Sequence, residues 1–403
     1  MLVLVAPGQG AQSPGFLTPW LEVPGVADRI AWWSAAADLD LVHYGTEADA
    51  ETIRDTAVAQ PLLVASGIAA ALALFPHPAE AFRQVGAVAG HSVGELTAAA
   101  GTGAITAEAA MVLVRERGRA MAAAAKVTRT SMTAVLGGDE DEVVAVIDKY
   151  GLTAANRNGA GQIVAAGTVE QLADFQADPP ARSKLRALSV AGAFHTDHMA
   201  LAVDRMRELA KGVSTRDPRI RYISNRDGAV VHSGREVVDR MIAQIANPVR
   251  WDLCMETMRE LGVTGLLEVP PAGTLTALAR RAIPGVATFA LKTPDQLDDA
   301  RAFVAEHAEH HSVANPLNTA PTWRLVVAPF SGTVQRGVPG GAAVEPGDVL
   351  AEGAQIGTVV SRREQRTLVA EHGGTVLEWL VEDGDPVAPG QPLLRVHPKA
   401  EAH

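Results

Sequence analysis

The sequence predicts an α/β protein with a parallel β-sheet, a smaller inserted α/β subdomain and a C-terminal all-β barrel. Apolar runs that end in glycine-rich turns and continue into Ala-rich stretches predict buried parallel strands and their helices. A β-α-β-β-α-β pattern between residues 131 and 190 predicts the insert. A repeated pattern of short strands and Gly/Pro turns over residues 323–398 predicts the barrel.

The composition fits two or three domains with a large core, since the chain has 403 residues and 47% are hydrophobic. The net charge of −11 argues against nucleic acid or an anionic membrane surface as the main partner. It does not exclude an acidic carrier protein as a partner, because Lys and Arg can still cluster locally. No apolar stretch is expected to span a membrane, and no basic signal-peptide region precedes the first strand. Cys254 is the single cysteine, which fits a small buried residue and a cytoplasmic location.

The first predicted strand, Leu2 to Ala6, ends in a glycine-rich loop, Pro7 to Gln12. Ligands of α/β folds bind at the C-terminal ends of the strands, so this loop can bring a backbone N–H close to a substrate carbonyl. No Gly-Lys-Ser/Thr sequence follows, which excludes a phosphate-binding loop. A plain β–α turn is the alternative interpretation.

The sequence Gly-His-Ser-Val-Gly at residues 90–94 lies between an apolar run, residues 85–89, and an Ala-rich stretch, residues 95–101. A G-x-S-x-G motif between a strand and a helix is typical of the nucleophile elbow of α/β-hydrolase-like folds. Such a turn exposes Ser92 Oγ and directs the N-terminus of a helix at it, where an oxyanion is stabilised. An ordinary turn in a chain rich in Gly and Ala is the alternative.

The insert is predicted to be a ferredoxin-like subdomain over residues 126–196, with residues 1–125 and 197–300 forming the large α/β subdomain. We expect the active site in the cleft between the two. The predicted strands are Ser131–Gly137, Leu152–Asn156, Gln162–Gly167 and Lys184–Val190, with helices near 139–150 and 169–176.

Eight motifs extend over about residues 1–300. In chain order they are Pro7–Gln12, Gln60–Leu63, Gly90–Glu95, Val114–Met121, Asn156–Gly159, Gly192–Thr196, Asn247–Trp251 and Leu267–Gly273. In this order and spacing they resemble the malonyl-CoA:acyl carrier protein transacylase family and the related acyltransferase domains of polyketide synthases. The resemblance implies transfer of a malonyl group from malonyl-CoA to the phosphopantetheine thiol of an acyl carrier protein through an acyl-serine, in fatty acid or polyketide synthesis.

The resemblance also implies the catalytic residues. Ser92 is the expected nucleophile, and a serine hydroxyl needs a base at neutral pH. His195 is the expected base, because its Gly-Ala-Phe-His-Thr block is similar to that of the family's catalytic histidine; without the block, a satisfied core or turn histidine is the alternative. The backbone N–H groups of Val93 and Gln9 are the expected oxyanion hole.

No Asp or Glu stands out as a third member of a triad. The resemblance implies instead that a backbone carbonyl near Arg250 orients His195, at a position where the family often has Gln. If the Arg250 side chain also touches the site, its positive charge would lower the pKa of His195.

The helix predicted over residues 107–125 carries Arg115, Arg117 and Arg119, which cannot all share one face. The resemblance selects Arg117 as the residue that binds the malonyl carboxylate. A buried carboxylate needs a bidentate partner, which Arg supplies and Lys does not. The alternative is that all three arginines are solvated.

Five further residues are expected to contact the substrate: Gln60, His91, Asn156, Phe194 and Arg250. His91 adjoins the nucleophile, but neighbours on a tight turn point apart, so we expect it to line the pocket. Phe194 resembles the block of malonyl-selective acyltransferases, where a ring crowds a 2-methyl group; one methyl discriminates by only ~1–3 kcal/mol. No metal or cofactor is expected beyond the coenzyme A thioester.

Residues 301–322 are predicted to be a helix end and linker. The His/Glu run Glu306–His311 within it invites a metal interpretation, but no other ligand set accompanies it. The repeat then pairs residues 331–334 with 373–376, and 341–350 with 384–393. These halves resemble the biotinyl/lipoyl carrier domain.

The barrel departs from that resemblance at one point. Biotinyl and lipoyl domains present a lysine on the hairpin between their halves, whereas this chain has no lysine from Thr293 to Pro398. We therefore expect no attached biotin or lipoyl group. The hairpin region, Ser361–Arg366, carries three arginines that either dock an acidic protein partner or form a solvated turn.

Two other functions remain as alternatives at this stage. The first is a hydrolase of the same fold that clears acyl chains from a carrier, which would have no need of a carboxylate clamp such as Arg117. The second is a scaffold in which the barrel recruits partners, against which the intact set of Ser92, His195 and Arg117 argues.

Overall fold

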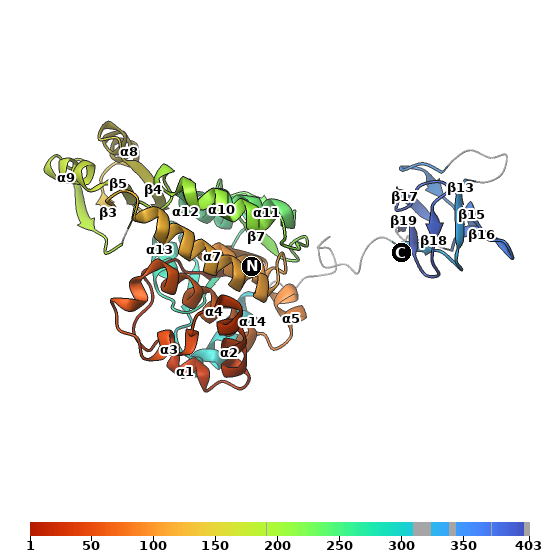
Figure 1. Cartoon of the computed structure of the whole chain (residues 1–403), viewed down its shortest axis with the longest axis horizontal. Coiled ribbons are helices and arrows are strands. Elements are labelled where there is room, and N and C mark those ends of the chain that lie inside the picture. The colour runs from red at the N-terminus through yellow and green to blue at the C-terminus, as the bar shows by residue number, and fades with distance from the viewer. Residues whose placement is uncertain (191, 309–323, 338–343, 372, 399–403) are drawn as a thin grey trace. The chain divides into compact units, whose positions relative to one another are not determined.

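The structure is a computed structural model that describes residues 1–190, 192–308, 324–337, 344–371 and 373–398. The chain forms two compact units, Met1–His311 and Ser312–His403 (Figure 1). Each unit is described separately below.

The first unit is built on a six-stranded sheet with the strand order β11-β10-β1-β2-β7-β8. All neighbouring strands are parallel except the edge pair β7–β8. The strands are β1 (Leu2–Ala6), β2 (Ala87–Gly90), β7 (Arg221–Ile223), β8 (Val230–Val231), β10 (Gly265–Glu268) and β11 (Ala287–Ala290). The predicted parallel sheet is confirmed, and β1 has the predicted bounds.

The central strand β1 is buried on both faces because every one of its residues is apolar. Leu2, Leu4 and Ala6 belong to the core that α4, α6 and α7 share, whereas Val3 and Val5 belong to a second core with α12 and α13. The helices of this unit are α1 (Thr18–Leu21), α2 (Val26–Ala37), α3 (Leu41–Thr46), α4 (Thr56–Leu74), α5 (Pro78–Gln84), α6 (Gly94–Gly101), α7 (Ala107–Ala125), α10 (Ala200–Ala210), α11 (Gly234–Ala243), α12 (Trp251–Glu260), α13 (Thr274–Ala282) and α14 (Leu297–His307).

Helix α4 is long and apolar enough to cross a membrane by length and composition alone, with a mean hydropathy of 1.9. It is the one such helix in the described part of the chain, and 72% of the window is buried inside the fold. Core helices pass the same test, so this is weak support for a membrane span. The expectation that no stretch spans a membrane therefore stays a prediction.

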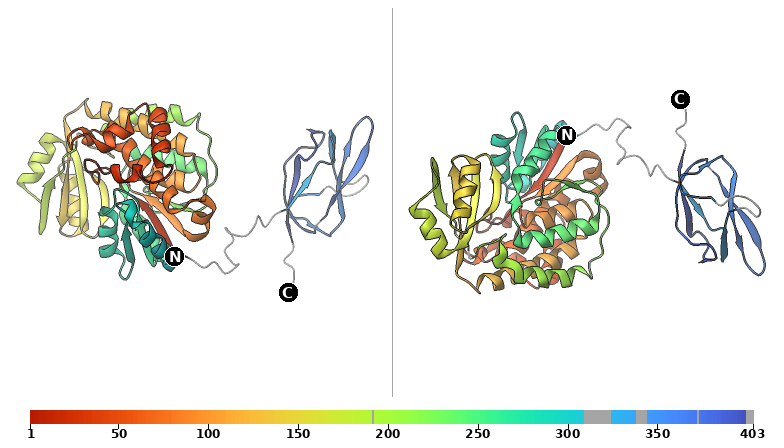
Figure 2. Two further views of the ribbon diagram at one scale, coloured as in Figure 1. Left: turned by 90° about the horizontal axis from the view of Figure 1, so that it is seen from below. Right: turned by 90° about the horizontal axis from the view of Figure 1, so that it is seen from above.

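The insert has the predicted β-α-β-β-α-β order and forms a separate lobe, yellow to yellow-green in Figure 2. Its strands follow the order β6-β3-β5-β4, and β9 (Val249–Arg250) adds a fifth strand parallel to β4. The last predicted strand, 184–190, is too long, because β6 ends at Ala187. The elements are β3 (Thr130–Gly137), α8 (Glu140–Lys149), β4 (Thr153–Gly159), β5 (Gln162–Thr168), α9 (Val169–Ala177) and β6 (Ser183–Ala187).

The second unit consists of two four-stranded sheets, β12-β19-β17-β14 and β16-β15-β13-β18, around one apolar core. The two halves of the repeat correspond strand by strand, β12 to β16, β13 to β17, β14 to β18 and β15 to β19. Swapping each strand with its counterpart converts one sheet order into the other, so the sequence repeat is a structural repeat. The strands are β12 (Arg324–Val327), β13 (Gly332–Arg336), β14 (Val349–Leu350), β15 (Ala354–Val360), β16 (Gln365–Ala370), β17 (Gly374–Trp379), β18 (Pro386–Val387) and β19 (Pro392–Pro398).

One boundary near the linker differs from expectation. Residues 301–307 belong to helix α14 and are the predicted helix end, so the linker starts later than residue 301. Residues 309–322 of that linker, with Glu309, His310 and His311 of the His/Glu run, lie outside the described residues. The hairpin turn between the halves is where the sequence places it, with Ser361 N–H donating to Glu364 O at 2.8 Å.

Candidate active site

Ser92 occupies the sharp turn between β2 and α6 in a left-handed backbone conformation, with φ of 54°. The two flanking glycines make this turn sterically feasible. A Cβ on Gly90 would lie 1.9 Å from the Gly94 carbonyl carbon, and a Cβ on Gly94 would lie 2.2 Å from the Ala6 oxygen. The motif therefore forms a strained strand–turn–helix that presents Ser92 at the N-terminus of α6.

His195 lies against this serine, although the two are 103 residues apart in the chain. Its Nε2 is 2.8 Å from Ser92 Oγ, and its Nδ1 is 2.7 Å from the Gln244 carbonyl oxygen. His195 also has a positive φ, 61°. Both catalytic candidates thus hold unusual backbone conformations that the surrounding fold must stabilise.

The environment of His195 favours the neutral imidazole. Burial, followed by the positive charge of Arg117, lowers the pKa of His195 to about 3. A neutral ring that donates from Nδ1 to the Gln244 carbonyl leaves Nε2 as an acceptor facing the Ser92 hydroxyl. This is the protonation state that a general base needs before the reaction begins.

The carbonyl that orients His195 belongs to Gln244, not to a residue near Arg250 as the sequence was interpreted. Gln244 lies in the short helix η3 (Gln244–Ala246), before the Asn247–Trp251 block. Arg250 lies on β9, where its side chain forms a bidentate pair with Asp252 at 2.8 and 3.0 Å. The alternative in which the Arg250 charge acts on His195 is therefore wrong; the nearby positive charge is that of Arg117.

Arg117, in the middle of α7, is 3% exposed and points toward the nucleophile. One terminal nitrogen donates to Gln60 Oε1 at 2.7 Å, and the other donates to Gln244 Oε1 at 2.9 Å and lies 3.5 Å from Ser92 Oγ. Burial lowers its pKa to about 10, so it stays charged at neutral pH. Arg115 and Arg119 instead lie on the outer side of α7 and pair with Asp38.

The two expected oxyanion donors line one cavity with Ser92 and His195. Among the described residues, neither the Gln9 N–H nor the Val93 N–H has a protein acceptor. The Gln9 side chain points away and donates to the Arg54 carbonyl at 3.0 Å. Both backbone donors are therefore available to a ligand in this cavity.

This cavity has a volume of about 240 Å³ and takes residues from both subdomains. Gln60, His91, Asn156 and Phe194 all line it, as expected, whereas Arg250, which was also expected to contact the substrate, does not. Asn156 lies on strand β4, as the predicted strand 152–156 requires. His91 bonds Asn158 Oδ1 through Nε2 at 2.8 Å, and burial lowers its pKa, so the ring is a neutral wall of the pocket.

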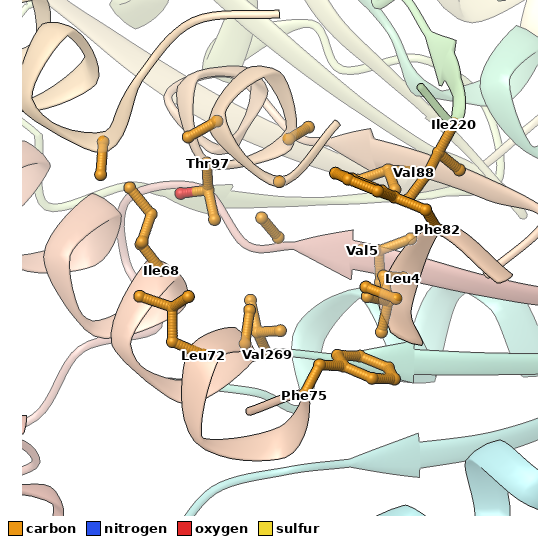
Figure 3. Close-up of a pocket in the computed structure, with 17 residues that line it drawn as sticks. Leu4, Val5, Ile68, Leu72, Phe75, Phe82, Val88, Thr97, Ile220 and Val269 are labelled. Carbon is orange, nitrogen blue, oxygen red and sulfur yellow. The ribbon is translucent and has the colours of Figure 1, made fainter. Parts of the chain in front are cut away.

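A second cavity, of about 160 Å³, lies beside the far part of α6. Figure 3 shows its aliphatic and aromatic lining, in which Thr97 is the polar side chain. It contains none of the groups described above. The candidate nucleophile and base therefore lie in the first cavity, of about 240 Å³.

The family model described as "Acyl transferase domain" matches residues 3–314. The chain belongs to this acyl transferase family. It is 50% identical to malonyl CoA-acyl carrier protein transacylase of Mycobacterium tuberculosis over 299 residues, which are 74% of this chain and 99% of the relative. It is 31% identical to the transacylase of the same name from Escherichia coli K12 over 306 residues, covering 73% of this chain and 96% of the relative.

Solved structures agree with this assignment. The crystal structure of the M. tuberculosis transacylase superposes with a TM-score of 0.72 at 49% identity, over 75% of this acyltransferase chain and 99% of that one. A malonyl-transacylase solved in complex with a type II polyketide synthase acyl carrier protein gives a TM-score of 0.69 at 27% identity, with coverage of 75% and 99%. The first unit therefore has the acyltransferase α/β fold.

Three polar residues of this acyltransferase site were missed by sequence reasoning: Glu95, Asn225 and Gln244. All three are at most 4% exposed. Glu95 was visible as the last residue of the Ser92 motif, and a charged residue at the start of an otherwise apolar helix is a signal for a buried polar partner. Asn225 lies in the loop after β7 and Gln244 in the three-residue helix η3, and no local pattern distinguishes them from surface residues.

Proposed function

We propose that this acyltransferase transfers a malonyl group from malonyl-CoA to the phosphopantetheine thiol of an acyl carrier protein. Such a transfer supplies fatty acid or polyketide synthesis. The observation that carries the proposal is the buried Arg117 guanidinium, 3.5 Å from the nucleophile Ser92 Oγ. The chain is also 50% identical to a malonyl CoA-acyl carrier protein transacylase over 99% of that relative's length, which supports the same reaction.

In the first half-reaction, Ser92 Oγ attacks the thioester carbonyl while His195 Nε2 takes the hydroxyl proton. The oxyanion of the tetrahedral intermediate accepts hydrogen bonds from the Val93 and Gln9 N–H groups. Collapse of the intermediate breaks the carbon–sulfur bond, and the departing coenzyme A sulfur takes the proton from His195. The product is a malonyl ester on Ser92.

In the second half-reaction, the same residues act in the reverse direction. The phosphopantetheine thiol gives its proton to His195 and attacks the ester carbonyl. Ser92 then leaves with the proton from His195, and the malonyl thioester of the carrier protein is released. Arg117 binds the malonyl carboxylate in both halves, and the Phe194 ring restricts space for a 2-methyl substituent.

Hydrolytic release of acyl groups is the second candidate, because water could deacylate Ser92 with the same base. A charged clamp at the acyl pocket favours malonyl over plain acyl chains, so we rank transfer first. The distinguishing experiment supplies labelled malonyl-CoA with and without an acyl carrier protein. Transfer predicts label on the carrier; free malonate formed at the same rate without a carrier would instead establish a hydrolase.

For the second unit, we propose a biotinyl/lipoyl-like domain that carries no biotin or lipoyl group. The paired four-stranded sheets and the sequence repeat support the resemblance. The hairpin Ser361–Glu364, where such a domain would present its lysine, has Arg362 and Arg363 at its tip, and a guanidinium does not form that amide. The unit therefore serves as a docking module rather than a swinging arm.

We propose an acidic protein, such as a carrier protein, as the partner of this hairpin. Arg362, Arg363 and Arg366 lie within five residues, and both tip arginines are exposed. Reversing the charge of both, Arg362→Glu with Arg363→Glu, would weaken a salt-sensitive complex measured by calorimetry. Removal of residues 318–403 that left both partner binding and malonyl transfer unchanged would contradict the docking role.

We place the whole reaction in the cytoplasm, since the single buried cysteine fits a reducing compartment.

A further inference from the structure

Glu95 is a buried carboxyl group that the proposed reaction does not use. It is the second residue of α6, three positions after the nucleophile, and it is 1% exposed. Its Oε1 accepts the backbone N–H of Asn225 at 2.6 Å, and its Oε2 accepts Gln244 Nε2 at 2.7 Å. Glu95 thereby ties the loop after β7 and the helix η3 to the start of α6.

The two residues that Glu95 holds both reach the nucleophile turn. Asn225 Oδ1 accepts the Ser92 N–H at 2.8 Å, and its Nδ2 donates to the Gly90 carbonyl at 2.8 Å. Gln244 Nε2 donates to the Ser92 carbonyl at 3.0 Å. The strained turn is therefore fastened at both its N–H and C=O groups.

Gln244 also reaches Arg117, and its amide can do so in only one orientation. Its Nε2 lies among three oxygens, those of Ser92 C=O, Asn225 Oδ1 and Glu95 Oε2, while its Oε1 accepts from Arg117. The reversed amide would place oxygen against three oxygens and its NH₂ group against the guanidinium. Glu95 supplies the carboxylate among these acceptors, and charge-assisted hydrogen bonds are the stronger ones.

The placement of Glu95 also leaves Arg117 free for a ligand. Among the described residues, no carboxylate lies within ion-pair distance of Arg117; its protein partners are the amide oxygens of Gln60 and Gln244. Burial raises the pKa of Glu95 to about 7. The hydrogen bonds that Glu95 accepts and the positive charge of Arg117 act in the opposite direction, but they do not outweigh the burial. The acid thus acts on the arginine through Gln244 without competing for its donors.

We propose that Glu95 is a positioning residue for carboxylate recognition, acting through Gln244 on Arg117 and through Asn225 on the Ser92 turn. The inference rests on the proposed function, since it assigns Arg117 to a carboxylated acyl group. It predicts that loss of the Glu95 charge harms a carboxylated donor more than a neutral one.

The experiment measures kcat and KM for acylation of Ser92 by malonyl-CoA and acetyl-CoA in the full chain and its variants, at pH 8, above the Glu95 pKa of about 7, so that Glu95 is charged. Glu95→Gln keeps the size of the side chain but sets an amide against the Asn225 N–H and the Gln244 amide. We expect its malonyl-over-acetyl preference in kcat/KM to fall about tenfold or more, the size of one lost hydrogen bond to a charged group. Most of the change is expected in KM for malonyl-CoA.

Glu268→Gln is the matched control. Glu268 is 0% exposed and accepts three backbone N–H groups, those of Gly273, Leu275 and Thr276. Loss of the Glu268 carboxylate is expected to lower the stability of the fold. Because Glu268 touches neither Arg117 nor Gln244 in the described structure, the malonyl-over-acetyl preference should stay that of the wild type. Glu95→Asp, which retains the charge on a shorter side chain, should show a preference between those of the wild type and Glu95→Gln. If Glu95→Gln does not fold, Glu95→Asp still tests the inference, because its misplaced carboxylate should reduce kcat/KM for malonyl-CoA more than for acetyl-CoA.

An equal loss for both donors in Glu95→Gln, or a wild-type preference, overturns the inference, because a merely structural carboxyl would act on both alike. If the wild type forms malonyl-enzyme readily and Glu95→Gln keeps the malonyl-over-acetyl preference, only this inference is overturned and the proposed function stands. A wild type that forms no malonyl-enzyme overturns the proposed function and the inference with it.

Discussion

The backbone carbonyl of Gln244 accepts the Nδ1–H of His195 at 2.7 Å, in the place that a carboxylate takes in a Ser-His-Asp triad. A neutral acceptor fixes the tautomer and the direction of the ring, but it stabilises an imidazolium less than a carboxylate does. The low pKa of His195 is consistent with this, since burial and the charge of Arg117 outweigh the Gln244 bond. The site is built for a thioester, whose leaving group requires less assistance than an amine.

The protonation state of His195 gives the first prediction. With a pKa near 3, its ring should remain neutral from pH 8 down to about pH 5. Carbon-13 NMR of labelled histidine, assigned by comparison with His195→Gln, should show no titration of its Cε1 signal in that range. A midpoint near the usual value of 6.5 would contradict the buried environment described here.

The same pKa has a consequence for stability. Because the folded-state pKa lies below the unfolded value of 6.5, His195 contributes stability that is present above pH 6.5 and is lost as pH falls toward 3. The free energy of unfolding of the wild type should therefore decline more between pH 7 and pH 5 than that of His195→Gln. Parallel urea titrations of the two proteins at both pH values measure this difference.

The base itself is tested by rate. His195→Gln should reduce acylation of Ser92 by about 10²–10⁴-fold, the usual contribution of a general base. Rapid-quench measurement of malonyl-enzyme formation gives the rate directly. His198 lies three residues along the chain in the short helix η2 (Asp197–Met199), and His198→Gln is the matched control that should retain the wild-type rate.

Arg117→Lys should lower kcat/KM for malonyl-CoA by about 10–100-fold and for acetyl-CoA far less, because Lys cannot replace the two-nitrogen fork that joins Gln60 and Gln244. Arg115→Lys, on the same helix but directed at Asp38, should leave both values unchanged. Equal losses for the two donors in Arg117→Lys would show that Arg117 does not recognise the carboxylate.

The glycines of the elbow are tested by stability. Gly90→Ala should destabilise the fold by at least about 2–3 kcal/mol, because its Cβ would lie 1.9 Å from Gly94 and the backbone would have to move. Gly101, at the end of α6, has nothing within 4 Å of a built Cβ. Gly101→Ala should therefore be neutral or stabilising, and equal losses of Tm in the two variants would contradict the close packing at the turn.

Strong local patterns predicted most of the fold. The apolar run of β1 and the helix over residues 107–125 have the predicted bounds, because an all-apolar strand and a long helix with a Thr106 N-cap are specified locally. Boundaries failed where local signals fade, as at the end of β6 and the start of the linker.

The candidate site was predicted to the extent that it depends on motifs. Ser92, His195 and Arg117 converge as expected, but the orienting carbonyl was assigned near Arg250 instead of Gln244. The shift arose because the Asn-Pro-Val-Arg-Trp block offers a recognisable pattern, whereas Gln244 lies three residues before it in a helix of one turn. The role of Gln244 is set by contacts with residues 19 to 152 positions away in sequence, which no local pattern encodes.

The most direct test of the account is intact-protein mass spectrometry after brief incubation with malonyl-CoA, in the wild type and in Ser92→Ala. The account predicts a malonyl adduct on the wild type, none on Ser92→Ala, and disappearance of the adduct when an acyl carrier protein with its phosphopantetheine arm is added, with the malonyl mass on the carrier. An adduct that forms equally on Ser92→Ala, or one that is lost to water but never reaches the carrier, would contradict it.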